Sequence, residues 1–138
     1  ERMACVLQGV ETNFDTDLFL PIIHAAEELA DVKYAEDKMA YRVIADHIRT
    51  VTFALSDGAM FDRAGRGYVL RRILRRAVRY GKNIGIDKPF LYTLVDVIYQ
   101  KTQNALRKLL RKKKWHSIRH YLRVKRRSRM LLHTLIIR

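Results

Sequence analysis

The chain has 138 residues, of which 49% are hydrophobic and 30% charged, and this composition favours one folded domain over a disordered segment. Its single cysteine, Cys5, excludes an internal disulfide and a metal site built from clustered cysteines. Only six glycines and two prolines are present, and no uncharged apolar run is long enough to span a membrane. We therefore expect an intracellular helical protein and, because the first residue is Glu1, a piece of a longer chain.

The formal charge of +14 is distributed very unevenly along the chain. Residues 1–100 contain all 14 acidic residues and half of the 28 lysines and arginines, so their charges cancel. Residues 101–138 contain the other 14 cations and no acid. This basic tail is either an arm that binds phosphates or a sequence of foreign origin, such as a frameshift product. Composition does not distinguish the two.

Apolar residues recur at helical spacing along most of the chain. We expect Asp15 or Thr16 to cap the second helix, Gly58 to follow the third and Gly81 to close the fourth. In the first helix, Met3, Val6, Leu7 and Val10 should share one apolar face. The sequence thus predicts an all-α bundle of four to five helices, placed at residues 2–10, 17–30, 39–55, 67–80 and from 90 onward.

The strongest local pattern is the arginine-rich segment between Gly65 and Lys82, which contains seven cations and no acid. Solvated helices normally mix the two signs, because like charges four residues apart repel each other. Arginine also suits phosphate, since its planar group donates two hydrogen bonds at once. The pattern therefore favours a phosphate-binding helix, and the alternative is a solvated face paired with acids from neighbouring helices. Five arginines share that face, Arg71, Arg72, Arg75, Arg76 and Arg79, and the inner ones would pair with Asp46, Asp57 or Asp62.

Other motifs do not assemble into a catalytic or metal site. Asp46 and His47 are adjacent on a helix and should point about 100° apart, so we expect no dyad but a polar pair bridging to a neighbouring helix. His116 and His120 have the spacing of two zinc ligands, but the tail offers no cysteine or acid as a third, so we expect no metal. The glycines at 65 and 67 form a turn and not a nucleotide-binding loop.

Four stretches of the chain match a known family in order and in spacing: Glu1-Arg2-Met3, Asn13 to Phe19, Ala40 to Arg49 and Gly65 to Tyr80. Together they resemble alanyl-tRNA synthetase, from the end of its third class II motif into its helical tRNA-recognition region. The resemblance ends near Ile98. The loop asparagine by which this family reads a stem base pair is missing from residues 61–65, so no base reader is assigned.

The resemblance implies three regions. Residues 1–13 would be the C-terminal end of the catalytic domain, with Arg2 contacting ATP phosphates, and residues 14–100 would be the helical tRNA-recognition domain. Residues 101–138 would be the basic tail, which we predict to be out of frame or misjoined. The catalytic antiparallel sheet, the zinc-containing editing domain and the oligomerisation region would lie elsewhere in the parent enzyme. The residues implied in tRNA binding are Arg66, Arg71, Arg72, Arg75, Arg76 and Arg79.

By that resemblance, the parent enzyme is a cytoplasmic ligase that activates alanine with ATP and Mg and attaches it to tRNA(Ala). This chain would supply the end of the ATP site and the acceptor-stem contacts, and by itself it should be inactive. The alternatives are a non-catalytic basic helical module that binds RNA and, less favoured, an amphipathic segment that lies on anionic membranes.

Overall fold

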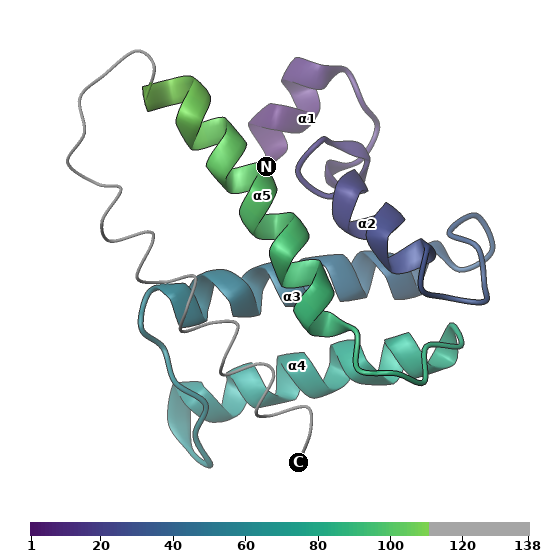
Figure 1. Cartoon of the computed structure of the whole chain (residues 1–138), viewed down its shortest axis with the longest axis vertical. Coiled ribbons are helices and arrows are strands. Elements are labelled where there is room, and N and C mark those ends of the chain that lie inside the picture. The colour runs from purple at the N-terminus through teal and green to yellow at the C-terminus, as the bar shows by residue number, and fades with distance from the viewer. Residues whose placement is uncertain (111–138) are drawn as a thin grey trace.

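The predicted all-α fold is confirmed by a computed structural model of the chain, which describes the backbone of residues 1–110 and the side chains of residues 1–104. Within that range there are five α-helices, one short 3-10 helix and no strand, so the antiparallel catalytic sheet is not among the described elements (Figure 1). The elements are α1 (Arg2–Gln8), η1 (Asn13–Asp15), α2 (Leu20–Glu27), α3 (Lys38–Ser56), α4 (Gly65–Asn83) and α5 (Leu91–Leu110).

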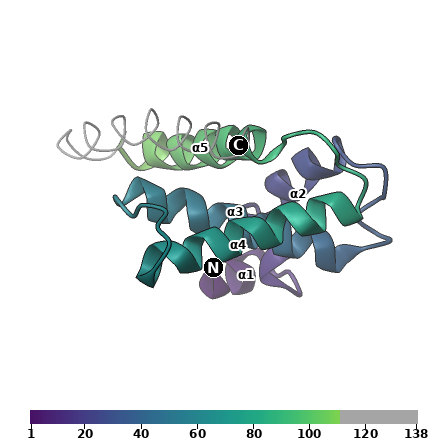
Figure 2. The ribbon, with the colours of Figure 1, turned by 90° about the horizontal axis from the view of Figure 1, so that it is seen from below.

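The central element is α3, which contacts α2, α4 and α5. α3 and α4 lie side by side and run in opposite directions, while α5 crosses over α3 (Figures 1 and 2). Viewed from below, α5 covers one side of the α3–α4 layer and α1 lies toward the other side (Figure 2). The α3 side chains that hold this arrangement recur every three or four residues and are fully buried: Ala40, Tyr41, Ile44, Ala45, Ile48, Val51 and Leu55.

The ends of α3 follow local chemistry that the sequence signals well. Asp37 precedes the helix, and its side chain accepts a hydrogen bond from the backbone N–H of Ala40 at 3.0 Å. After the helix, Gly58 adopts a positive φ of 96°, a conformation that glycine reaches without steric cost. The predicted helix at 39–55 therefore differs from the observed one by a single residue at each end.

The predicted start of the second helix was wrong. Neither Asp15 nor Thr16 caps α2 with its side chain, because the carboxylate of Asp15 and the hydroxyl of Thr16 both form hydrogen bonds within the preceding turn. Thr16 donates to the carbonyl of Asn13 at 2.6 Å, and Asp15 accepts from the hydroxyl of Thr12 at 2.5 Å. The turn thus forms η1, and α2 begins three residues later than expected, at Leu20.

Gly81 was expected to end the arginine-rich helix because glycine often follows a helix, and this prediction was wrong. α4 continues through Gly81 to Asn83, and the positive φ lies instead at Gly85. Gly81 is buried against the ring of Phe90, and an added Cβ would be only 2.5 Å from Cε1 of that ring. The glycine therefore provides space for an aromatic side chain and not a helix stop.

The helix predicted at residues 2–10 is present as α1, and its apolar face lies outside the core. No residue of α1 is buried, and the side chains of Met3, Val6 and Leu7 are 77–82% exposed. The helix has only seven residues and packs mainly against the η1 segment that follows it. Its apolar face therefore has no partner within residues 1–104. None of the described helices combines the length and apolar character that a bilayer span requires.

Tyr41 connects the loop between α2 and α3 to the core through a hydrogen bond and a ring contact. Its ring is fully buried, its hydroxyl donates to the carbonyl oxygen of Val32, and the ring of Tyr34 packs edge-on against it at 5.7 Å. Burial, together with the nearby carboxylates of Glu27 and Asp37, raises the pKa of Tyr41 above its ordinary value of 10.0. The folded protein therefore holds the phenol in its neutral form.

Replacing Tyr41 by Phe should lower the free energy of unfolding by about 1 kcal/mol at neutral pH, because the carbonyl of Val32 loses its donor. The wild-type protein should then lose stability as the pH rises above about 10, since the unfolded chain ionises first. Tyr41→Phe lacks this loss, so the free energies of unfolding of the two proteins, measured with urea, should converge as the pH rises. If their difference stays constant through alkaline pH, the raised pKa is wrongly assigned to Tyr41.

Candidate nucleic-acid interface

One narrow stripe of α4 anchors the arginine-rich helix against the rest of the protein. The stripe contains small and branched residues that are buried at helical spacing. Gly67 fits under the preceding loop, where an added Cβ would be 2.5 Å from the carbonyl oxygen of Met60. The other buried members are Leu70, Leu74, Ala77 and Gly81. Because this stripe is narrow, most of the α4 surface remains available to solvent or to a ligand.

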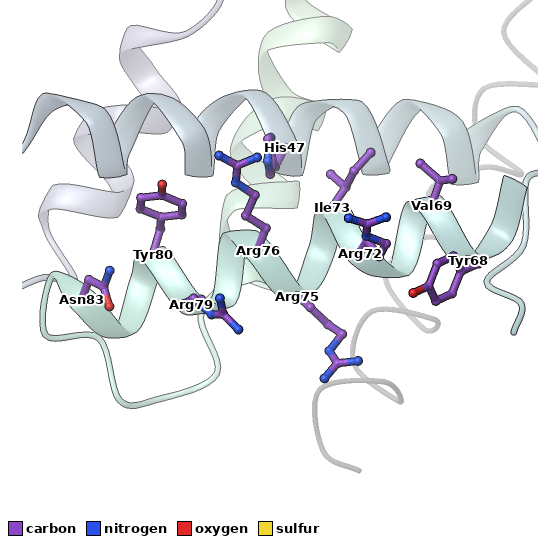
Figure 3. A pocket seen from close by; sticks show the side chains of 10 residues that line it. All are labelled: His47, Tyr68, Val69, Arg72, Ile73, Arg75, Arg76, Arg79, Tyr80 and Asn83. Carbon is purple, nitrogen blue, oxygen red and sulfur yellow. The ribbon is translucent and has the colours of Figure 1, made fainter.

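An open groove of about 860 Å³ runs along α4 beside α3. α4 provides nearly all of its lining, and α3 contributes His47 (Figure 3). The side chain of Arg76 points toward His47, whereas Arg75 points away from α3 (Figure 3). The lining residues are His47, Tyr68, Val69, Arg72, Ile73, Arg75, Arg76, Arg79, Tyr80 and Asn83.

The structure brings four of the six predicted tRNA-binding arginines into this groove, namely Arg72, Arg75, Arg76 and Arg79. The other two do not line it. Arg66 is exposed in the first turn of α4, and Arg71 is half-buried on the same helix. Arg2, the predicted ATP contact, is exposed at the start of α1 and is not part of the groove.

The arginines of α4 form no ion pair with any acid of the described part of the chain. Pairing of the inner arginines with Asp46, Asp57 or Asp62 is not observed. The groove lining contains four arginines and no carboxylate, and the arginines recur at spacings of three and four residues, where like charges repel. The site therefore carries a concentrated positive charge that internal partners do not neutralise.

Two arginines of α3 show what structural arginines look like in the same protein. The guanidinium of Arg49 lies 5.3 Å from the ring centre of Phe19 and 5.1 Å from that of Phe53, and its Nε donates to Glu1 at 3.1 Å. Arg42 donates to the hydroxyl of Tyr34 at 3.2 Å and lies over the ring of Phe14. Both cations thus combine a ring contact with a side-chain hydrogen bond, a combination that none of the four groove arginines has among the described residues.

The aromatic residues of the groove were missed by the sequence analysis. The guanidinium carbon of Arg72 lies 5.9 Å from the ring centre of Tyr68, and that of Arg76 lies 5.8 Å from Tyr80. In each pair the two residues are four apart on α4, so both project from the same side of the helix. This spacing was visible in the sequence and could have revealed the pairs.

His47 was expected to bridge to a neighbouring helix and not to contact Asp46. The structure corrects the second point, because Nδ1 of His47 lies 3.2 Å from Oδ2 of Asp46. The 100° separation of adjacent helical residues applies to their Cβ directions, and the two side chains bend toward each other beyond that point. His47 faces the α4 groove, so the pair adds an oriented imidazole to its wall.

The predicted ATP contact lies apart from the α4 groove, and no cluster of metal ligands is found in the described part of the chain. Arg2 is the single residue implied in ATP phosphate contact, and it does not line the groove. Within residues 1–104, no group of three or more His, Cys, Asp or Glu is arranged to hold a metal ion. His116 and His120 lie outside the described residues.

The chain belongs to a family of aminoacyl-tRNA synthetases. The family model described as tRNA synthetases class II (A) matches residues 1–126, which is most of the chain. The match extends beyond Ile98, where the resemblance was expected to end. That residues 101–138 are out of frame or misjoined stays a prediction.

The similar curated proteins are alanine–tRNA ligases, which confirms the resemblance to alanyl-tRNA synthetase. The enzyme of Exiguobacterium sibiricum is 62% identical over 101 residues, covering 71% of this chain and 12% of the relative. The enzyme of Geobacillus kaustophilus is 63% identical over 101 residues, covering 71% and 11%. That of Acholeplasma laidlawii is 57% identical over 110 residues, covering 80% and 13%. The chain thus spans about an eighth of the length of these relatives.

Replacing Arg75 by Ala should raise the free energy of unfolding by about 0.5 kcal/mol at low salt, since Arg71 and Arg79 lie four residues away on either side and no acid partner is lost. The gain should shrink as salt screens the repulsion. Arg49→Ala is the matched control and should lower stability by about 1 kcal/mol, because that cation has aromatic and acidic partners. Urea unfolding at two salt concentrations measures both effects. Equal destabilisation by the two substitutions contradicts the distinction.

Proposed function

We propose that this chain is the part of an alanine–tRNA ligase that binds the acceptor stem of tRNA(Ala). The observation that carries this proposal is the α4 groove, where four arginines without acidic partners gather beside α3. A helix that retains such repulsion is stabilised by a polyanion, and the phosphate backbone of RNA is one. The names of the similar alanine–tRNA ligases support tRNA as that polyanion.

The dimensions of α4 fit a stretch of RNA backbone. From Arg66 to Arg79 the helix rises roughly 20 Å at 1.5 Å per residue, a length that matches several successive phosphates along one strand. Guanidinium groups on one side of such a helix contact phosphate oxygens, which position the stem but carry little sequence information. We therefore assign α4 to orientation of the stem and not to base reading.

The N-terminal part of the chain fits a junction with the remainder of the ligase. We propose that residues 1–13 end the catalytic domain and that Arg2 approaches the phosphates of ATP when that domain is present. The exposed apolar face of α1 supports this proposal, because Met3, Val6 and Leu7 would be covered by protein in a longer enzyme. Alanine activation and its dependence on ATP with Mg would then be properties of the whole enzyme.

The test is a salt titration of RNA binding by the 138-residue chain. Arg75→Ala and Arg79→Ala should each weaken binding to an acceptor-stem hairpin of tRNA(Ala). Each should also make the negative slope of log affinity against log salt shallower, by about 0.7–0.9. The loss should be the same for a non-cognate stem, since backbone contacts do not read sequence. Fluorescence anisotropy at several salt concentrations gives both quantities.

Lys88→Ala is the charge-matched control, because Lys88 is exposed in the loop between α4 and α5 and does not line the groove. It removes one positive charge while leaving the contribution of the basic tail unchanged, so the difference between the variants isolates the groove. The same comparison in a chain ending at Leu110, once circular dichroism shows that it folds, removes 11 of the 14 tail cations. If Arg75→Ala and Arg79→Ala behave like Lys88→Ala in both chains, α4 does not bind the stem.

A further inference from the structure

Exposed apolar side chains gather around the first turn of α4, at one end of the groove. Met60, Tyr68 and Val69 are each about half exposed, at 50%, 47% and 52%. The backbone of Met60 lies directly over Gly67, so the loop and the first turn of the helix are in tight contact. The patch is therefore held in place by the fold, next to the arginines.

The ring of Tyr68 is oriented but not buried. Arg72 lies 5.9 Å from its centre, and Figure 3 shows the ring projecting from α4 at the end of the groove. Tyr80 provides the contrast, because it has nearly the same distance to Arg76 but packs against the hydrophobic core. Tyr80 is thus partly buried against the core, whereas almost half of the surface of Tyr68 faces solvent.

We propose that Tyr68 stacks on an unpaired base of the bound RNA, while the groove arginines hold the phosphates beside that base. This inference rests on the proposed function. Bases inside a duplex have both faces covered by their neighbours, and the terminal pair of a stem has one free face, whereas an unpaired nucleotide next to the stem can turn either face toward the ring. A groove with several cations, no carboxylate and an exposed aromatic ring combines the two features by which proteins bind single strands.

The occupant follows from the charges that surround the ring. The groove presents Arg72, Arg75, Arg76 and Arg79 along α4, so a ligand that reaches Tyr68 along this groove must also be strongly anionic. Each unit of a nucleotide strand combines a negatively charged phosphate, which suits the arginines, with a flat aromatic base, which suits the ring of Tyr68. The end of a stem with an unpaired extension is therefore the ligand that fits.

The experiment compares two RNA hairpins with the same stem, one blunt and one with a short single-stranded 3′ extension, on the full 138-residue chain. The ratio of their affinities is the readout, because the basic tail contributes similarly to both. The wild-type chain should prefer the extended hairpin by roughly 5- to 150-fold, as expected for stacking of one base. Tyr68→Ala and Tyr68→Leu should abolish this preference, and Tyr68→Phe should retain it. Leu29→Ala, which removes a similarly exposed apolar side chain (46%) just after α2 and outside the groove, should also retain it.

A fluorescent adenine analogue in the extension reports stacking directly. Its emission should be quenched on binding to the wild type and to Tyr68→Phe, but not on binding to Tyr68→Leu. The proposal is overturned if the wild type shows no preference, if Tyr68→Ala leaves the ratio unchanged, or if Leu29→Ala reduces it equally. Arg75→Ala separates the two proposals, because it should weaken both hairpins without altering their ratio. If Arg75→Ala weakens neither, the proposed function fails; if it weakens both while Tyr68→Ala has no effect, only the stacking fails.

Discussion

Burial of a single stripe of α3 determines where the arginines of α4 lie. Ile44, Ile48 and Val51 are fully buried, and the helix that carries them contacts α2, α4 and α5. α4 is held beside α3 by a narrow stripe of its own, in which Gly67 and Gly81 leave room for a loop and for the ring of Phe90. Because the core uses so little of α4, the remaining surface of that helix is free to carry charge.

The same protein uses arginine in two ways, and the contrast supports the functional proposal. Arg42 and Arg49 of α3 stack on phenylalanine rings and find hydrogen-bond partners, so they contribute to stability. The α4 arginines have no acidic partner among the described residues and repel one another at helical spacing. A cationic surface that costs stability is expected where a polyanion binds. The aromatic ring at one end of the groove then extends the proposed contact from the duplex stem to an unpaired nucleotide.

Much of the fold could be predicted from the sequence, because α3 and α4 have long apolar periods and clear local signals such as Asp37 and Gly58. The predictions of helix ends were wrong where the same residue type can have more than one structural role. Gly81 looked like a helix stop but makes space for Phe90, which is distant in sequence from the arginine motif. Thr16 looked like a cap but its hydroxyl is used in η1. The apolar spacing of α1 correctly indicated a helix, but periodicity does not say which partner covers the apolar face, and Met3, Val6 and Leu7 are exposed. In the site, the positive charge was predictable, whereas the role of His47 depends on the packing of α3 against α4.

The central claim is that the groove arginines of α4, and not the cations already held by the fold, contact the RNA backbone. NMR spectra of the arginine Nε–Hε groups during titration with an acceptor-stem hairpin test this claim directly, with Arg42 and Arg49 as internal references. We predict that the signals of Arg72, Arg75, Arg76 and Arg79 shift together and saturate at one equivalent, while those of Arg42 and Arg49 stay in place. Shifts confined to cations outside α4, with the four groove signals unchanged at saturation, would contradict the claim.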